Sequence, residues 1–282
     1  MSLAPVALAF TSGNFPIGIS LGIDDMGSRK YTESEIKQLL VTELSSIRKA
    51  TEAKLNREIE ILGITCPDFI SEHGYTGTLM DAAVHIQPGI KTSAIAWPYL
   101  HSTRMAYQLN NAKTLGYPVG TDIDLEDSHL VHFDYQNSLL KVSIAAIGTD
   151  ATNVKRHFRI LNFGGAGQIP TPKELEYLST RTKALIKAEL SEPPTPYASP
   201  TQLSDFRRII FSGDAPASEF EKIREAITKI IPEFSDRFME NIEPKWVGAV
   251  GAARLARVYK LYPYLYEIQG QIYEEVDPHD EL

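Results

Sequence analysis

Hydrophobic and polar positions recur along this chain with two periods, one typical of helices and one typical of strands. Thr32-Glu33-Ser34-Glu35 forms a capping-box pattern, and apolar residues then recur at helical spacing from Ile36 to Ile47. A second cap at Thr171, followed by Pro172 and Glu174, predicts a helix over Pro172–Leu190. The other predicted helices are Thr78–Ile86, Ser102–Asn111, Ser218–Ile230 and Lys245–Tyr259.

Short apolar or alternating runs between these segments predict strands. The predicted strands are Pro5–Phe10, Phe15–Ile23, Ile59–Thr65, Thr92–Trp97, His129–Phe133, Leu139–Ile147, Phe158–Phe163 and Arg208–Ser212. Strands and helices that alternate in this way predict an α/β fold built in layers. The segment Ser191–Pro200 contains four prolines and is predicted to be a stiff loop.

Composition narrows the class of protein. The chain has 282 residues, of which 43% are hydrophobic and 23% charged, as expected of one large or two smaller globular domains. A net charge of -8 without any Lys/Arg-rich run argues against binding to nucleic acid. No apolar run approaches the roughly 20 residues that cross a bilayer. The single cysteine, Cys66, excludes an intrachain disulfide and is expected to be a core residue.

The segment Val131–Ile144 (VHFDYQNSLLKVSI) contains a strand that ends near Asp134 and a second strand that closes with Val142-Ser143-Ile144. This register resembles the second phosphate loop of the actin-like ATPase superfamily, in the form carried by seventy-kilodalton heat-shock chaperones. There, glycines and a Thr follow the first Asp, and a second Asp precedes the closing residues. The replacements in this chain are Gln136, Asn137 and Ser138 for the glycines, Leu139 for the Thr and Lys141 for the second Asp. Glycines let backbone N–H groups approach phosphate. The resemblance therefore implies a relative whose loop no longer binds phosphate.

Further stretches carry the resemblance in the order that the family has them. Ile209–Ala215 is similar to the strand and turn that hold adenosine, although only Gly213 remains of a Gly-Gly-Ser turn. Glu243–Ala253 is similar to the family's closing motif, with gapless matches at Pro244, Gly251, Ala252 and Ala253. Segments similar to parts of the first lobe are Tyr31–Glu60, Ile64–Pro67 and Ala106–Leu109.

The chain departs from the family in its first phosphate loop and in two intervals that are shorter than the family's. Gly18–Gly22 resembles the first phosphate loop, with Ser20 in place of the metal-linked Asp, although an ordinary strand with glycines explains it equally well. The short interval before Thr32 leaves no room for the family's small subdomain, which carries the lysine that assists hydrolysis. The interval between Gly165 and Leu203 is also too short for the second small subdomain.

The resemblance implies a degenerate, truncated member of this group, of the kind found in fungi. Its expected fold is α/β: a two-lobed actin-like ATPase core, ribonuclease H-like, with reduced outer subdomains. The first lobe is predicted over residues 1–126 and the second over 127–282. In the second lobe the outer subdomain would be reduced to the helix 172–190 and the Pro-rich loop 191–202.

The resemblance also implies a ligand site between the lobes. Its predicted members are Asp134, Tyr135, Gln136, Asn137, Gly164, Gly165, Lys187, Gly213, Asp214 and Ala215. Lys187 and Ser191 fall where the family contacts adenosine, but Ala184 replaces the neighbouring Glu, which argues against nucleoside binding. For Gly164 and Gly165 a glycine turn before a capped helix is an equally good explanation.

Three other groups of residues are candidates for a functional role, and each also has a purely structural explanation. His132 and Asp134 lie two apart on a predicted strand and form a candidate acid–base pair, or simply the polar rim of a strand end. The acidic residues Asp122, Asp124, Glu126 and Asp127 offer oxygens to a hard cation, but their spacing favours a solvated loop, and no metal is expected. The small residues Gly248, Ala249, Gly251, Ala252 and Ala253 predict a close helix-packing face.

Three functions remain open. The first is a pseudo-ATPase that binds a small ligand or a protein partner without hydrolysing ATP, with no required cofactor and no nucleic acid or membrane partner. The second is an enzyme that uses the cleft for small-molecule isomerisation or cyclisation, for example in fungal secondary metabolism. The third is a residual ATP-binding chaperone-like protein. His279-Asp280-Glu281-Leu282 resembles a retrieval signal of the endoplasmic reticulum, but without a convincing signal peptide a cytoplasmic location is expected.

Overall fold

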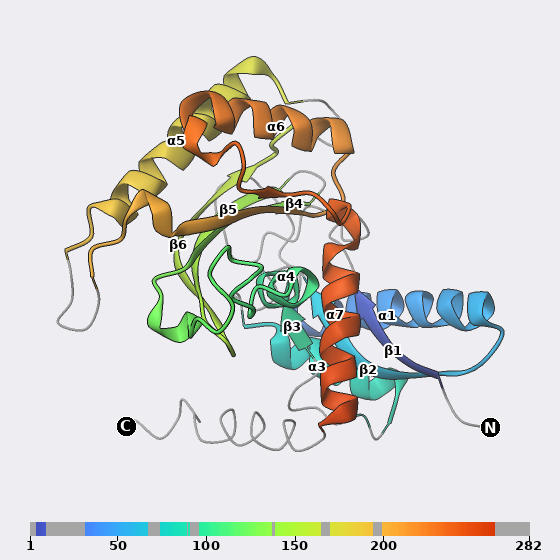
Figure 1. Ribbon diagram of the computed structural model, residues 1–282. Helices are drawn as coiled ribbons and strands as arrows, with labels where there is room; N and C mark the ends of the chain where they lie inside the picture. The colour runs from blue at the N-terminus through green and yellow to red at the C-terminus, as the bar shows by residue number, and fades with distance from the viewer. Residues whose placement is uncertain are drawn as a thin grey trace, which may run out of the picture. The chain divides into compact units, whose positions relative to one another are not determined.

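The structure is a computed structural model that describes residues 4–9, 32–66, 74–88, 90, 96–136, 139–164, 170–193 and 199–262. The chain is a mixed α/β protein with two sheets (Figure 1). It forms two compact units, one from Met1–Ser102 with Gly248–Leu282 and the other from Thr103–Val247. The chain therefore changes unit inside helix α4 (Tyr99–Tyr107) and inside helix α7 (Pro244–Leu261), whereas the sequence suggested a division at 126/127.

The first unit contains a parallel sheet in the order β1 (Ala4–Ala9), β2 (Ile59–Cys66), β3 (Ala96–Pro98). Helix α1 (Glu33–Leu55) follows β1, and helix α3 (Thr76–Ile86) follows β2. The predicted capping box of α1 is confirmed, because Thr32 accepts from the backbone of Glu35 and Glu35 caps the backbone of Thr32. The buried face of α1 carries Ile36, Leu40 and Leu44, which pack with the apolar residues of β2 and α3.

The second unit contains a five-stranded mixed sheet in the order β6-β5-β4-β7-β8. The strand bounds are β4 (His129–Gln136), β5 (Leu139–Ile147), β6 (Thr152–Leu161), β7 (Phe206–Ser212) and β8 (Phe238–Met239). Strand β5 is antiparallel to both of its neighbours, while β4, β7 and β8 are parallel. Helices α5 (Pro172–Leu190) and α6 (Ala217–Ile230) cover one face of this sheet (Figure 1). Among the described residues of this unit, 3-10 helices lie at Ile123–Leu125, Leu203–Asp205 and Pro232–Phe234.

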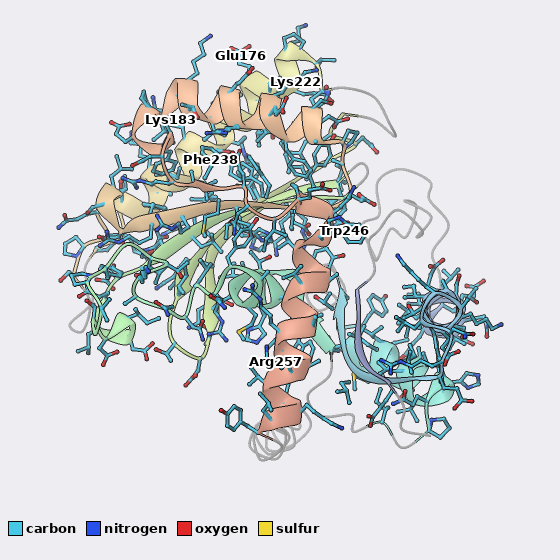
Figure 2. All side chains as sticks on the ribbon, turned by 45° about the vertical axis from the view of Figure 1, so that its right-hand side comes forward. Glu176, Lys183, Lys222, Phe238, Trp246 and Arg257 are labelled. Atoms are coloured by element: carbon cyan, nitrogen blue, oxygen red, sulfur yellow. The ribbon has the colours of Figure 1, made fainter. Side chains whose placement is uncertain are left out.

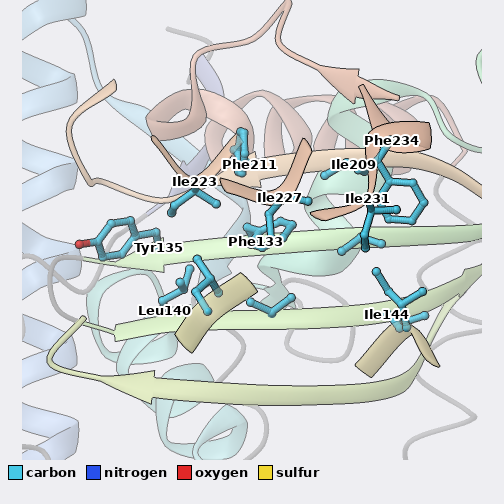
Figure 3. Packing of buried hydrophobic residues seen from close by; sticks show 14 of the residues in the cluster. Phe133, Tyr135, Leu140, Ile144, Ile209, Phe211, Ile223, Ile227, Ile231 and Phe234 are labelled. Carbon is cyan, nitrogen blue, oxygen red and sulfur yellow. The ribbon is translucent and has the colours of Figure 1, made fainter. Parts of the chain in front are cut away.

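Alternate residues of β4 lie on opposite faces of the sheet, and this decides which are available for chemistry. Val131, Phe133 and Tyr135 belong to the hydrophobic core with β7 and α6 (Figure 3). The residues between them, His132, Asp134 and Gln136, therefore lie on the other face. Although polar, all three are buried. The core fixes β4 in place and so fixes the position of these polar residues.

Most predicted elements agree closely with the structure. Strand β5 and helix α5 have the predicted bounds, and the second capping box, at Thr171, is confirmed. Strand β6 begins at Thr152 instead of Phe158, β4 continues to Gln136, and α4 ends at Tyr107 because Gln108 turns left-handed at φ 53°. Strand β8 was not predicted. The predicted strand Phe15–Ile23 and the segment Gly18–Gly22 lie outside the described residues.

Within the described segments, no helix combines the length and apolar character that a membrane span requires.

Candidate functional site

Asp134 and Ser212 lie opposite each other at the carboxyl ends of the parallel neighbours β4 and β7. The Ser212 hydroxyl donates a hydrogen bond of 2.9 Å to Asp134 Oδ1. The Gln136 amide donates a second one, of 2.6 Å, to the same oxygen. All three side chains are buried, so this carboxylate is held by protein donors in a water-poor environment.

His132 extends this hydrogen-bonded group. Its Nε2 lies 2.8 Å from Ser212 Oγ, and the Thr103 hydroxyl of α4 lies 3.5 Å from the same nitrogen. Because Ser212 gives its proton to Asp134, the consistent tautomer of His132 donates from Nε2 to Ser212. His132, Ser212, Asp134 and Gln136 thus form one continuous set of hydrogen bonds, which we call the Asp134 network. The predicted shared face of His132 and Asp134 is confirmed, with Ser212 joining the two side chains.

Lys141 of β5 lies directly opposite Asp134 in the antiparallel register, and it is also buried. Arg159 of β6 is the next residue in the same cross-strand row. Opposite charges in register on one sheet face attract each other, so Lys141 places a positive charge beside the Asp134 network. Lys141 stands where the resembled family has its second Asp.

The turn after β7 lies directly on the backbone of β4. Gly213 has a φ of +118°, and a Cβ added there would lie 2.0 Å from the carbonyl oxygen of Tyr135. The same oxygen accepts a hydrogen bond of 3.3 Å from the backbone N–H of Ala215. Only glycine fits this close approach, so packing alone requires it. Asp214 lies within the same turn and is partly exposed.

Tyr135 connects this turn to the end of β6. Its hydroxyl donates a hydrogen bond of 2.9 Å to the carbonyl oxygen of Phe163. Burial raises the pKa of Tyr135 well above its usual value, and a hydrogen bond with Glu219 raises it further. The phenol is therefore a stable neutral donor and not a proton source at ordinary pH.

Gly164 is explained by the start of α5. It has a φ of +73°, and its N–H donates to Glu174 at 3.3 Å. Glu174 is the third residue of α5 and forms the capping box with the N-cap residue Thr171, whose hydrogen bonds lower the pKa of Glu174, mainly the one from the Thr171 backbone N–H. These contacts favour a glycine turn before a capped helix over a phosphate contact at Gly164.

The predicted site residues therefore fall into three groups. The structure brings together Asp134, Tyr135, Gln136, Gly164, Gly213, Asp214 and Ala215 around the ends of β4, β6 and β7. Lys187 lies on the exposed side of α5 and is not part of the Asp134 network. Asn137 and Gly165 lie outside the described residues. The sequence analysis did not single out Ser212, although a polar residue that ends an apolar strand just before a glycine is a usable signal.

In the acidic loop around Asp122–Asp127, two carboxylates accept hydrogen bonds that stabilise the local backbone. Asp122 accepts from the backbone of Asp124 at 3.1 Å and caps the 3-10 helix Ile123–Leu125. Asp124 accepts from the backbone of Thr149 at 2.7 Å, and this hydrogen bond lowers its pKa. No group of three or more His, Cys, Asp or Glu side chains suited to a metal occurs in the part of the chain that the structure describes.

The small residues of α7 form a packing face, as predicted, but only in part. A Cβ on Gly251 would lie 1.9 Å from the carbonyl oxygen of Ser102, and one on Gly248 would lie 2.8 Å from the ring of Tyr99. Ala252 is buried, whereas Ala253 is exposed, so its place in the predicted face was wrong. Cys66 is buried, as expected of a core residue.

Comparison with known proteins adds no further site residue. No protein-family model matches the chain, and no curated protein matches it.

Proposed function

We propose that this chain is a relative of the actin-like ATPases that binds a small ligand or a protein partner without hydrolysing ATP. The observation that carries the proposal is that the Asp134 carboxylate is already hydrogen-bonded within the protein. Its Oδ1 accepts hydrogen bonds from Ser212 and Gln136, and Lys141 stands opposite in register. A carboxylate compensated in this way by its own protein is poorly placed to hold a metal-bound water for attack on a phosphate.

The strand order supports the relationship. A ribonuclease H-like lobe is expected to have three antiparallel strands, with two parallel strands added beside the first, and a helix between successive additions. The sheet β6-β5-β4-β7-β8, with α5 before β7 and α6 before β8, agrees with this order. In the first unit, β1, β2 and β3 with the intervening α1 and α3 repeat the pattern of β4, β7 and β8.

The loss of hydrolysis follows from what phosphoryl transfer requires. The transition state is stabilised almost entirely by positioned backbone donors, cations and a metal. Gln136 carries an amide where the resembled loop has bare backbone, and that amide is already bonded to Asp134. The retained Gly213 is accounted for by its contact with Tyr135 and needs no nucleotide to explain it.

The test is a magnesium-dependent ATPase assay on the full chain, with binding of ATP measured separately by calorimetry. We expect turnover equal to a buffer blank. Asp134→Ala and Asp127→Ala form a matched pair, since Asp127 is an exposed carboxylate outside the Asp134 network. Turnover that disappears in Asp134→Ala and persists in Asp127→Ala would contradict the proposal.

One observation favours the alternative of an enzyme. The hydrogen bonds from His132 through Ser212 to Asp134 form a path along which a proton can move. Such a relay suits isomerisation or cyclisation of a small molecule, because both need a proton removed at one atom and returned at another. The test compares the small molecules in cells that express the wild type, Ser212→Ala or Ser212→Thr. A product lost in Ser212→Ala and restored in Ser212→Thr supports an enzyme, and identical profiles contradict it.

A further inference from the structure

The amino end of β7 directs two consecutive arginines, Arg207 and Arg208, toward one loop. In the pairing with β4 the register shifts at this point, so that Arg207 is the extra residue of a β-bulge. The Arg207 guanidinium lies over the ring of Tyr117, 4.0 Å from its centroid, and Arg208 Nε donates a hydrogen bond of 2.7 Å to the carbonyl oxygen of Thr114. Consecutive residues of a regular strand point to opposite faces, and the bulge explains why both arginines reach the segment 114–117.

Arg237, the residue before β8, is the third arginine of this group. Its Nη1 donates hydrogen bonds of 2.6 and 2.7 Å to the carbonyl oxygens of Leu203 and Phe206, directly beside the bulge. Burial lowers the pKa of Arg208 and of Arg237, and repulsion by the charge of Arg207 lowers both further. The three guanidinium groups therefore lie close enough to repel one another. We call Arg207, Arg208 and Arg237 the arginine cluster.

The carboxylates near the arginine cluster do not neutralise it. Asp236, Glu233 and Asp205 act to raise the pKa of Arg237, but burial and the like charges outweigh them, and the pKa stays below its ordinary value. In the described ranges no carboxylate comes within ion-pair distance of the three guanidinium groups. Asp205 is used locally, because it accepts a hydrogen bond of 2.7 Å from the backbone N–H of Gln202. The cluster thus keeps a positive charge that its own surroundings do not compensate.

Arg207 has a donor that nothing described in the structure accepts. Its Nε is buried and has no hydrogen-bond partner there. A buried donor without an acceptor is costly, and a bound ion is one of its ordinary explanations. The Tyr117 hydroxyl lies 2.9 Å from Ser128 Oγ, within hydrogen-bond distance, so the ring under Arg207 is itself held in place. Stacking on a fixed ring orients the planar guanidinium before any ligand arrives.

We propose that the arginine cluster binds the phosphate group of a small, soluble phosphate monoester. Such a group carries about −1.5 to −2 charges and three terminal oxygens. It therefore suits three partly exposed guanidinium groups better than the single charge of a carboxylate does. The site lies at the end of β7 opposite to Ser212 and goes beyond the proposed function, since it does not depend on what the Asp134 network binds.

A simpler explanation is that these arginines serve the fold alone. That explanation covers Arg208 and Arg237, which donate to backbone carbonyl oxygens, but it leaves the buried Nε of Arg207 unexplained. Nucleic acid and an anionic membrane are weaker candidates. Both present many negative charges at once, and the exposed Glu233 and Asp236 beside the cluster would repel them, whereas one small dianion can approach the arginines alone.

The first experiment measures binding of phenyl phosphate to the full chain by calorimetry at constant ionic strength, with benzoate as the control of lower charge. We expect saturable binding of phenyl phosphate, at least about tenfold tighter than that of benzoate. Arg207→Gln should raise the dissociation constant of phenyl phosphate about tenfold or more. The matched control is Arg257→Gln, at an exposed arginine on α7 (Figure 2), which should change it by less than about twofold.

The absence of saturable binding, equal binding of the two ligands, or equal weakening in the two variants would overturn the proposal. Arg207→Lys is a second variant that keeps the positive charge and the stem but not the forked donors, so it serves even if Arg207→Gln does not fold. It should weaken binding of phenyl phosphate about threefold or more, and unchanged affinity would overturn recognition by the guanidinium. A further arm adds vesicles that contain phosphatidic acid. Binding to these vesicles without binding of phenyl phosphate would assign the cluster to a lipid headgroup and overturn the soluble ligand.

Discussion

The carbonyl oxygen of Tyr135 occupies the place where a side chain at position 213 would begin. The distance from that oxygen to a Cβ built on Gly213 is 2.0 Å, and the carbonyl carbon lies at 2.5 Å. Both atoms belong to the backbone of a central strand, which cannot rotate away as a side chain does. Gly213, which follows β7 directly, is therefore a requirement of packing, and its presence alone is no sign of a nucleotide.

Gly213→Ala should lower the free energy of unfolding by about 3 kcal/mol or more, because it adds a steric overlap to an unfavourable φ. Urea denaturation of the full chain measures the change. Gly120→Ala is the control, since Gly120 also has a positive φ (+92°) but no atom within 4 Å of a Cβ. That control should cost about 1 kcal/mol. Equal losses would show that the contact with Tyr135 is not the cause.

Ser212→Ala should lower the free energy of unfolding by about 2 kcal/mol, because it leaves His132 and Asp134 without the hydroxyl that joins them. The exposed Ser204 provides the control, and Ser204→Ala should change stability by less than about 0.5 kcal/mol. A double-mutant cycle with Asp134→Asn then measures the coupling. Strictly additive effects would refute a shared network.

Gly251→Ala should be destabilising by about 2 kcal/mol or more, because its methyl group would overlap the Ser102 backbone. The neighbouring Ala253→Leu places a larger side chain on the exposed side of the same helix and should have an effect below about 0.5 kcal/mol. Thermal unfolding of both variants gives the comparison. If Ala253→Leu is the more harmful change, the packing face has been assigned to the wrong side of α7.

Stability should fall as pH rises through the ordinary tyrosine value of 10.0. Burial raises the pKa values of Tyr135 and Tyr107, so the folded protein holds these protons more tightly than the unfolded chain. Their contribution is complete below pH 10.0 and is lost progressively above it. Tyr135→Phe should make the alkaline fall shallower, whereas Tyr177→Phe, at an exposed position, should leave its slope unchanged. Chemical denaturation as a function of pH supplies the measurement.

Local signals in the sequence were sufficient where an element is defined by its own residues. Helix α5 has the predicted bounds because Thr171, Pro172 and Glu174 determine its start through short-range contacts. Strand β6 began too late in the prediction because Lys155, Arg156 and His157 give it no apolar alternation. An edge strand is half solvated, and its first residues therefore lack the hydrophobic pattern by which strands are recognised.

The Asp134 network shows a second limit of prediction from the sequence. His132, Asp134 and Gln136 alternate on one strand, so their common face follows from the sequence. Ser212 joins them only because β7 pairs with β4 in a particular register, across almost eighty residues of chain. Lys141, in contrast, lies opposite Asp134 through the register of β4 and β5, which are consecutive along the chain. Pairing between distant strands is a property of the folded sheet and is not visible in either strand alone.

The division of α4 and α7 between the two compact units has a consequence for the order of folding during synthesis. Gly251 and Tyr259 of α7 contact Ser102 and Trp97, so the first unit is completed by a helix that is synthesised after the sheet of the second unit. Residues 103–243 of the second unit are synthesised before that helix, which begins at Pro244. Apolar surface of the sheet β1-β2-β3 therefore stays uncovered while the second unit is synthesised. Apolar surface that is exposed in this way during synthesis favours aggregation of the incomplete chain.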